Sequence, residues 1–200
     1  MKHKKHGVII AIIVFIVLII PPVILGFVYY KTYNSLTNQE ITKEQTLSDL
    51  AALALKIKLD HLVSIASSLA ASQGVVVSVN NGQWSDAANA ARDLENNVNF
   101  YDPFIDRIII FDASATQQAA YPQLTGGLGT NASSSSWYAA LSNGDQSSFV
   151  SGVVRRVSIP QIQVVNIAAP ITSDQGLVGF LVLQIPTDNF FEFVRAYTLF

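Results

Sequence analysis

The feature that most constrains this chain is an uncharged and strongly apolar run close to the amino terminus, from Gly7 to Tyr30. A helix needs about 20 apolar residues to cross the hydrocarbon of a bilayer. Inside lipid the backbone must also satisfy its own hydrogen bonds, which a helix does. The sequence therefore predicts a transmembrane signal-anchor helix over residues 7–30, after a basic leader over residues 1–6 and before a folded domain.

The charges that flank this run predict its orientation. Lys2, Lys4 and Lys5 precede the run and only Lys31 follows it closely, and cytoplasmic flanks of membrane spans are enriched in Lys and Arg. We therefore expect the chain in the cytoplasmic (inner) membrane with a single visible span. The amino terminus is expected inside and the main domain outside the cytoplasm.

Two other interpretations of the amino terminus stay open. Val8 to Ile20 has the length of the apolar core of a cleaved signal peptide, but the apolar run continues to Tyr30 and no small-x-small cleavage site follows it. The leader that ends at Gly7 is similar to that of type IV pilins, structural surface proteins whose usual Glu would fall at Ile12 here. That missing Glu and the length of the run favour a retained anchor over both.

The remaining composition excludes several classes of function. Without its three leader lysines the chain has 9 basic against 14 acidic residues, a balance of −5. No basic stripe remains to hold a phosphate backbone, so nucleic-acid binding is disfavoured. The absence of cysteine excludes disulfides, thiol catalysis and zinc sites with Cys ligands. No nucleophile-base pair, metal cluster or phosphate loop is recognisable, so we expect no cofactor, metal or catalytic residue in this sequence.

Periodic apolar residues predict that a long helix, Leu36 to Ser72, fills the membrane-emergent segment 34–74. At about 1.5 Å per residue such a helix could extend on the order of 55 Å from the membrane. Its stripe is expected to pack on the domain's own sheet or on a second subunit. The stripe recurs at alternating steps of four and three residues, at Leu55, Leu59, Leu62, Ala66 and Leu69.

The rest of the chain predicts a mixed module over residues 75–186 and an exit segment over residues 187–200. A short β-like run, Val75–Val79, and a helix, Ser85–Asn97, come first. Apolar runs and turn residues then predict strands at Arg107–Asp112, Gln117–Tyr121, Ser147–Val154, Ile162–Ala169 and Leu177–Ile185, with a helix at Ser136–Ser142. The predicted fold class is α+β: a transmembrane helix continuing into a long helix, then a PAS-like module with a five-stranded antiparallel sheet and covering helices.

An ordered series of short motifs in this module resembles a Cache domain. The motifs are Trp137-Tyr138-Ala139-Ala140-Leu141, Gly144, Phe149-Val150-Ser151, residues 165–171, Asp174-Gln175-Gly176 and residues 179–185. Cache domains are extracytoplasmic sensors of bacterial chemoreceptors, histidine kinases and cyclases. The resemblance covers about Leu36 to Phe200. It implies a sensor (input) region of a membrane signal-transduction receptor that binds a small extracellular ligand and relays occupancy through the membrane helix.

The carboxy-terminal segment Asn189–Val194 resembles the exit from the membrane-distal half of a double Cache domain. In that family a second module, a second transmembrane helix and a cytoplasmic output domain follow. We therefore expect an amino-terminal fragment or an incomplete gene product, and a single-module Cache protein that ends in its own second anchor, also missing here, is the alternative. The family resemblance also implies a homodimer. Any catalysis would belong to a missing histidine kinase or nucleotide cyclase domain.

The resemblance also implies where a ligand would bind, between the sheet and the loop and helix that cover it. Aromatic walls with a few polar groups are usual for small-ligand sites. Alternatively, the aromatic pair before Ala139 and Ala140 simply seals the core. The implied ligand-binding positions are Tyr121, Trp137, Tyr138, Ser151 and Gln184.

Two of the matched positions argue against one class of ligand. Amino-acid-binding members have an Arg two residues before the Trp-Tyr pair and an Asp on the last strand. Here these positions hold Ser135 and Gln184, so a charge-assisted clamp is absent from them. We expect a neutral or weakly polar ligand, or no ligand, rather than a free α-amino acid.

The basic pair Arg155-Arg156 could hold a carboxylate. It lies next to the turn predicted at Val157–Pro160, and an exposed hairpin end is the favoured interpretation.

The remaining candidates for chemistry are expected to be structural. Asp106 should pair with a nearby charge and Asp112 should cap the end of its strand, and with Asp102 they lack the spacing of an EF-hand calcium site. His61 is isolated on the long helix and is expected to be solvated or at an interface.

Overall fold

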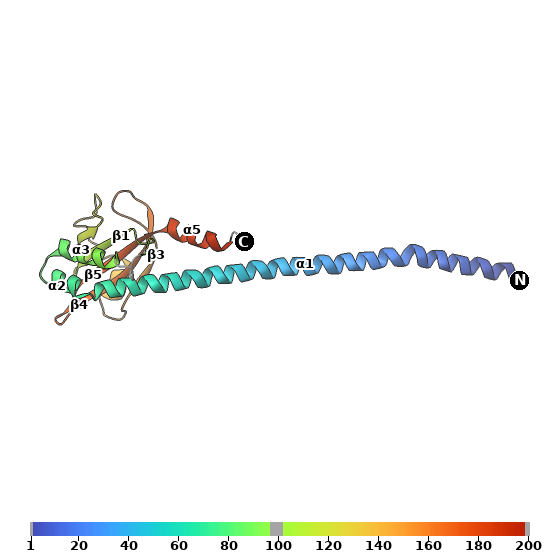
Figure 1. Ribbon diagram of the computed structural model, residues 1–200, viewed down its shortest axis with the longest axis horizontal. Helices are drawn as coiled ribbons and strands as arrows, with labels where there is room; N and C mark the ends of the chain where they lie inside the picture. The colour runs from blue at the N-terminus through green and yellow to red at the C-terminus, as the bar shows by residue number, and fades with distance from the viewer. Residues whose placement is uncertain (1, 97–101, 199–200) are drawn as a thin grey trace. The chain divides into compact units, whose positions relative to one another are not determined.

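The computed structural model describes residues 2–96 and 102–198. The chain divides into two compact units, Met1–Leu50 and Ala51–Phe200. The described part of the first unit belongs entirely to helix α1 (Lys2–Ala70), which also supplies the first helical residues of the second. The second unit is a mixed α/β domain (Figure 1). After α1 its elements are α2 (Gln73–Asn80), α3 (Trp84–Glu95), β1 (Arg107–Asp112), β2 (Gln117–Tyr121), α4 (Ser136–Leu141), β3 (Phe149–Arg155), β4 (Gln163–Ser173), β5 (Gly176–Pro186) and α5 (Thr187–Thr198).

The five strands form one antiparallel sheet in the order β2-β1-β5-β4-β3. The central strand β5 pairs with β1 on one side and β4 on the other, so that Gln184 lies opposite both Arg107 and Asn166. The predicted α+β class, with a long amino-terminal helix and a five-stranded antiparallel sheet, is confirmed.

One side of the sheet, which we call the helical face, packs against α1, α2 and α3. Side chains alternate between the two sides of a strand, and the alternate residues that point to this side are aliphatic. They meet Leu62, Ile65 and Leu69 of α1. The strand residues of this core are Ile108, Ile110, Ala119, Ile167, Ala169, Ile171, Leu181, Leu183 and Ile185.

The opposite side, which we call the cavity face, has a smaller apolar cluster covered by α4. Trp137 and Leu141 of α4 pack there on Phe111, Phe180 and neighbouring strand residues. This cluster occupies only part of the face, and polar residues occupy the rest.

The predicted β-like run at Val75–Val79 is wrong, because these residues form helix α2. Val75 and Val79 lie four residues apart and are 0% and 4% exposed, whereas Val77 between them is 48% exposed. This spacing matches one turn of a helix. Burial of one valine face against the helical core therefore overrides the preference of β-branched residues for strands.

The strand expected to end at Ala169 continues to Ser173. A proline lacks the N–H that a sheet needs, so Pro170 is unusual inside a strand. The last residue of β4 that pairs with β3 is Ala168, opposite Phe149. Pro170 lies beyond that point and pairs only with β5, where β4 has no neighbour among the described strands on its other side.

The predicted long helix forms as part of α1, which ends at Ala70 rather than at Ser72, and its stripe packs on the domain's own core through Leu62, Ala66 and Leu69. The predicted helix end at Asn97 lies outside the described residues. Among the described residues from Leu18 onward, no single helix has both the length and the hydropathy of a membrane span. The helical segment Leu18–Ala70 and α2, which meet at a bend of 52°, satisfy both criteria only when they are taken as a pair.

Candidate functional site

A cavity of about 430 Å³ lies on the cavity face of the sheet. Its floor comes from β1, β3, β4 and β5, and its cover comes from Trp137 and the segment before α4. The turn between β3 and β4 supplies the third wall with Arg156 and Ser158.

Arg107 begins β1 and is 2% exposed. Its Nε donates to the carbonyl oxygen of Pro122 at 3.1 Å, and its Nη1 donates to Ser158 Oγ at 2.7 Å. With the Gln117 amide in the orientation that satisfies both of its ends, Arg107 Nη2 donates to Gln117 Oε1 at 3.1 Å. All three partners are neutral, so the Arg107 guanidinium has no carboxylate bonded to it among the described residues.

Burial, and after it the charge of the nearby Arg156 guanidinium, lower the pKa of Arg107 to about 10, although Asp106 opposes the change. The group is still a cation at neutral pH. A buried cation whose partners are all neutral favours the approach of an anion, because the desolvation of its charge is not compensated by an opposite charge.

Arg156 is a second buried arginine of the cavity wall, 4% exposed. It forms an ion pair with Asp106 through Nη1, and its Nε donates to the carbonyl oxygen of Pro160 at 3.0 Å. The expectation of an exposed hairpin end is therefore wrong for Arg156, because the turn folds its side chain back toward Asp106. Arg155 is exposed, as expected, and lines the rim of the cavity.

Gln184 and Asn166 continue the polar floor across the sheet. Gln184 Nε2 donates to Asn166 Oδ1 at 3.2 Å. Gln184 Oε1 is buried and receives no hydrogen bond from the described residues. Ser151 Oγ accepts from the backbone N–H of Asn166 at 2.9 Å and donates to the carbonyl of Gly152 at 2.6 Å. The acceptor that remains to be satisfied is thus Gln184 Oε1.

Trp137 is both a cavity wall and a core residue. It lines the cavity, is 3% exposed, and packs with its ring centroid 5.1 Å from that of Phe111 and 5.2 Å from that of Phe180. Tyr138 does not line the cavity. It packs on Phe180 at 5.5 Å, and its hydroxyl donates to the carbonyl of Ala113 at 3.4 Å.

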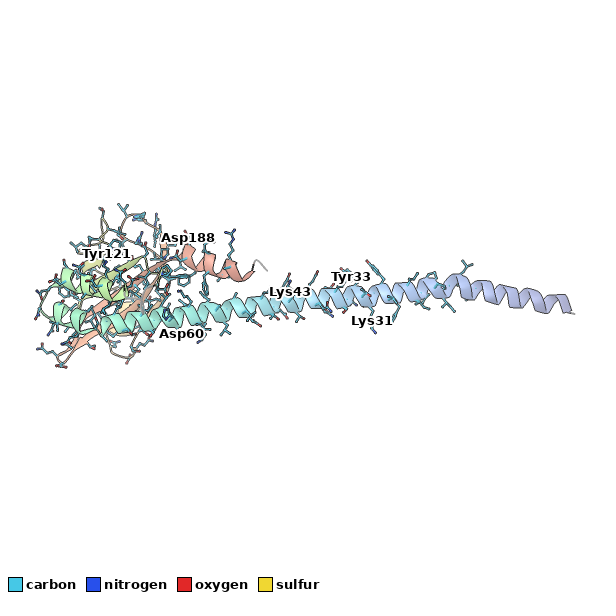
Figure 2. All side chains as sticks on the ribbon, viewed as in Figure 1. Lys31, Tyr33, Lys43, Asp60, Tyr121 and Asp188 are labelled. Atoms are coloured by element: carbon cyan, nitrogen blue, oxygen red, sulfur yellow. The ribbon has the colours of Figure 1, made fainter. Side chains whose placement is uncertain are left out.

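Tyr121, labelled in Figure 2, also lies outside the cavity lining. It ends β2, and the guanidinium of Arg92 lies 4.5 Å from its ring centroid. Of the five implied ligand positions, the structure therefore brings Trp137, Ser151 and Gln184 together and leaves Tyr121 and Tyr138 outside.

Sequence reasoning missed several lining residues. Arg107 could have been found from the strand pattern. It lies two residues before Ile109 and four before Phe111, and alternate residues of a strand point to the same face. Asn166 shares a face with Ala168 in the same way. Arg156 was noted only as part of a basic pair at a turn, and the sequence carried no such signal for Gln117 or Ser158.

Asp102 organises a second polar cluster in the domain. It is 2% exposed and accepts from Lys58 Nζ at 2.6 Å and from the backbone N–H of Phe104 at 3.0 Å. His61 is half-exposed, with Nε2 3.8 Å from Asp102 Oδ2. Among the residues that the structure describes, no group of three His, Cys, Asp or Glu side chains could hold a metal ion.

The structure also locates two other carboxylates. Asp112 caps the turn after β1, as expected, accepting hydrogen bonds from Ser114, Thr116 and Gln118. Burial raises the pKa of Asp112, but these hydrogen bonds together outweigh burial and lower it. Burial raises the pKa of Glu95 on α3, and the charge of Asp102 raises it further, against a hydrogen bond from the Asp102 backbone and the charge of Arg92.

No protein-family model matches this chain, and no curated protein sequence matches it. Solved structures do. With the sensor domain of the V. cholerae histidine kinase DctB, the TM-score is 0.59 at 15% identity, over 76% of this chain and 58% of that one. With the ligand-binding domain of the Pseudomonas fluorescens chemoreceptor CtaA in complex with L-isoleucine, it is 0.56 at 12% identity, over 72% and 56%.

A third similar structure is the ligand-binding domain of the Pseudomonas aeruginosa amino acid chemoreceptor PctB in complex with L-Arg. The TM-score is 0.57 at 12% identity, over 76% of this chain and 55% of that one. The chain thus spans somewhat more than half the length of these solved domains. At these identities the likeness establishes the fold, which is that of Cache-type sensor domains of chemoreceptors and histidine kinases, as predicted.

Proposed function

We propose that this chain is the extracytoplasmic input region of a membrane signal-transduction receptor and that it binds a small ligand in the cavity face of its sheet. The observation that carries the proposal is the cavity itself, which lies within a sensor fold and is lined by a buried arginine, an amide with an unpaired buried oxygen and an aromatic side chain. A volume near 430 Å³ lies in the range of about 300–1,000 Å³ usual for small-molecule sites.

The residues assigned to the ligand are Arg107, Trp137, Ser151, Asn166 and Gln184. Trp137 supplies apolar surface, and the others supply charge and hydrogen bonds to the floor. Tyr121 and Tyr138 are not assigned, because they lie outside the lining. Ligand binding on this fold is supported by the similar domains of CtaA and PctB, which were solved with amino acids bound.

A chain of contacts connects the cavity to α1. Arg156 in the cavity wall pairs with Asp106, and the backbone N–H of Asp106 donates to the carbonyl of Gln184 at 3.0 Å. Four residues earlier, Asp102 binds Lys58 of α1 at 2.6 Å. A ligand that competes for Arg156 or moves Gln184 therefore acts on the segment that holds α1, which is the differential contact that a two-state relay requires.

The relay has its own test. Asp106→Ala removes the carboxylate that pairs with Arg156 and leaves the floor of the cavity intact. It should retain ligand binding but weaken the ligand-induced change in hydrogen exchange of α1 around Lys58. An unchanged response in α1 would contradict this route.

Membrane anchoring and dimerisation complete the proposal. The uncharged run over residues 7–30 is assigned to the membrane span. Farther along α1, Leu50, Leu53 and Ile57 are 52%, 53% and 60% exposed. Their steps of three and four residues match the seam of a coiled coil, which supports a homodimer formed by two α1 helices.

The test of the sensor function uses the full chain in lipid nanodiscs and a broad library of small metabolites. A ligand that binds only the folded state raises the melting temperature. Ser134 is exposed at the mouth of the cavity, so Ser134→Trp should block entry without disturbing the core. The matched control is Asn143→Trp, an exposed position beyond α4 that does not line the cavity.

A compound that stabilises the wild type and Asn143→Trp but not Ser134→Trp supports the proposal. If no compound in the library stabilises the protein, or if every stabilising compound acts equally on Ser134→Trp, the cavity is not a sensor site.

A further inference from the structure

The charges that line the cavity are unbalanced. Arg107, Arg155 and Arg156 line it, and none of its lining residues is an Asp or Glu. Arg156 is neutralised by Asp106, and Arg155 is exposed at the rim. Arg107 is thus the one lining arginine that is buried and bonded only to neutral groups among the described residues.

The Arg107 guanidinium also has donors to spare. An arginine side chain carries five N–H bonds, and three of its nitrogen atoms here each have one neutral partner. One further N–H therefore remains on each of Nη1 and Nη2. Two such donors match the two oxygens of a carboxylate.

The residue opposite this cation in the sheet carries an unpaired acceptor. Gln184 faces Arg107 across the β1–β5 ladder, where directly opposite side chains lie about 5 Å apart at Cβ and on the same side of the sheet. Gln184 Oε1 is buried without a donor from the described residues, and an unpaired buried acceptor is costly. A small ligand that presents both a carboxylate and an O–H or N–H to this floor would satisfy both groups.

The charges around the cavity floor indicate whether the ligand's hydrogen-bond donor is neutral or cationic. An ammonium would add a positive charge beside Arg107, and the lining residues offer no carboxylate to hold it. A hydroxyl brings a donor without charge. Like charges at short range disfavour each other strongly in a buried site, so a neutral donor fits this floor better than a cationic one.

Resting on the proposed sensor function, we propose that the ligand is a small 2-hydroxy monocarboxylate. Its carboxylate binds Arg107 with Ser158 nearby, its hydroxyl donates to Gln184 Oε1, and its carbon chain lies against Trp137. The class differs from the amino acids bound in the similar domains of CtaA and PctB.

The experiment measures binding of four matched probes to the full chain in nanodiscs by titration calorimetry. Lactate carries both groups, propionate lacks the hydroxyl, lactamide lacks the charge, and alanine replaces the hydroxyl by ammonium. Lactate should bind at least about tenfold more tightly than each of the other three, since a site built for a hydroxyl rejects analogues that leave its buried groups unpaired. Inorganic phosphate tests for a general anion site and should bind weakly.

Three variants assign the two contacts. Arg107→Met should weaken lactate binding by about 100-fold or more, since a buried charge-assisted contact is lost, whereas Arg155→Met at the exposed rim should weaken it less than about threefold. Gln184→Met should erase the preference for lactate over propionate while propionate binding is retained. This last readout does not move if Gln184 merely supports the fold, and thermal melts of each variant verify folding.

The outcomes separate this inference from the sensor function. If alanine, phosphate or a neutral library compound binds best and is blocked by Ser134→Trp, the ligand class is wrong and the sensor function stands. If lactate binding survives Arg107→Met, or if Gln184→Met keeps the preference for the hydroxyl, the assigned contacts are wrong. If neither these probes nor the library binds, both proposals fail.

Discussion

The two faces of the sheet are built from the same strands and differ in chemistry. On β5, Leu183 points to the helical face and is 0% exposed, while its neighbour Gln184 points to the cavity face with a polar atom left unpaired. On β1, Ile108 and Arg107 differ in the same way. The helical face is continuously aliphatic, whereas the cavity face joins an aromatic cluster to a polar floor.

This difference shows how one sheet can build an aliphatic core on one face and a polar cavity on the other. Because successive residues of a strand point to opposite sides, each strand contributes an aliphatic residue to the core and a neighbouring residue to the cavity. Polar groups tolerated on the cavity face would be costly if a one-residue shift in register exposed them to the helices. The two chemistries therefore also help to fix the register.

The largest expected effect tests the helical face. Leu183→Ala deletes a fully buried side chain and should lower the free energy of unfolding by about 2–5 kcal/mol, measured by urea denaturation. Gln184→Met, one residue along the same strand, should change it by less than about 1 kcal/mol. Similar losses from both substitutions would break the division between the faces.

A smaller loss of stability is expected at Asp112, the last residue of β1. Asp112→Ala removes the acceptor shared by Ser114, Thr116 and Gln118 and should cost about 1–3 kcal/mol. Because the folded-state pKa of Asp112 is lowered, its carboxylate stabilises the protein above its ordinary value near 3.8. This contribution is lost as the pH falls through the lowered pKa, and acid titration of wild type and variant measures it.

Glu95 should show the opposite sign, at the edge of the helical core. Because its pKa is raised from 4.5, the folded state binds the proton more tightly, so stability falls as the pH rises through the window above 4.5. Glu95→Gln should therefore raise the melting temperature at neutral pH by about 1–3 °C. The gain should disappear below pH 4, and a loss at neutral pH would contradict the assignment.

The smallest effect is expected at the cavity floor. Arg107→Met removes an incompletely compensated buried cation together with its neutral hydrogen bonds, two changes of opposite sign. The free energy of unfolding without ligand should stay within about 1 kcal/mol of the wild type. A loss of unfolding free energy as large as that of Leu183→Ala would instead show that Arg107 stabilises the fold. It would argue against a role for Arg107 in ligand binding.

The fold could be predicted from sequence where a continuous apolar run or a periodic apolar stripe identifies an element locally. The apolar run at Arg107–Asp112 and the stripe on the long helix both became the elements expected. Helix α2 could not, because the run Val75–Val79 resembles a strand and only the packing of Val75 and Val79 on the core selects a helix. Local preference is a weak guide where tertiary burial decides.

The candidate site was predictable only in part. Trp137, Ser151 and Gln184 line the cavity that the resemblance implied. The charge of the site was not predictable, because Arg107 and Arg156 lie 49 positions apart in the numbering and are brought together only by the β1–β5–β4 arrangement and the turn after β3. An absent arginine at Ser135 therefore did not mean an uncharged pocket.

The central strand β5 has one mechanical consequence. It ends at Pro186 and α5 begins at Thr187, so no loop separates Gln184 from the helix that leaves the domain. In α5, Asn189 Nδ2 donates to the carbonyl oxygen of Phe104 at 3.1 Å. The ring of Phe190 packs on that of Phe104 with the centroids 5.6 Å apart. The backbone between Gln184 and α5 therefore contains no loop that could absorb a displacement along the strand.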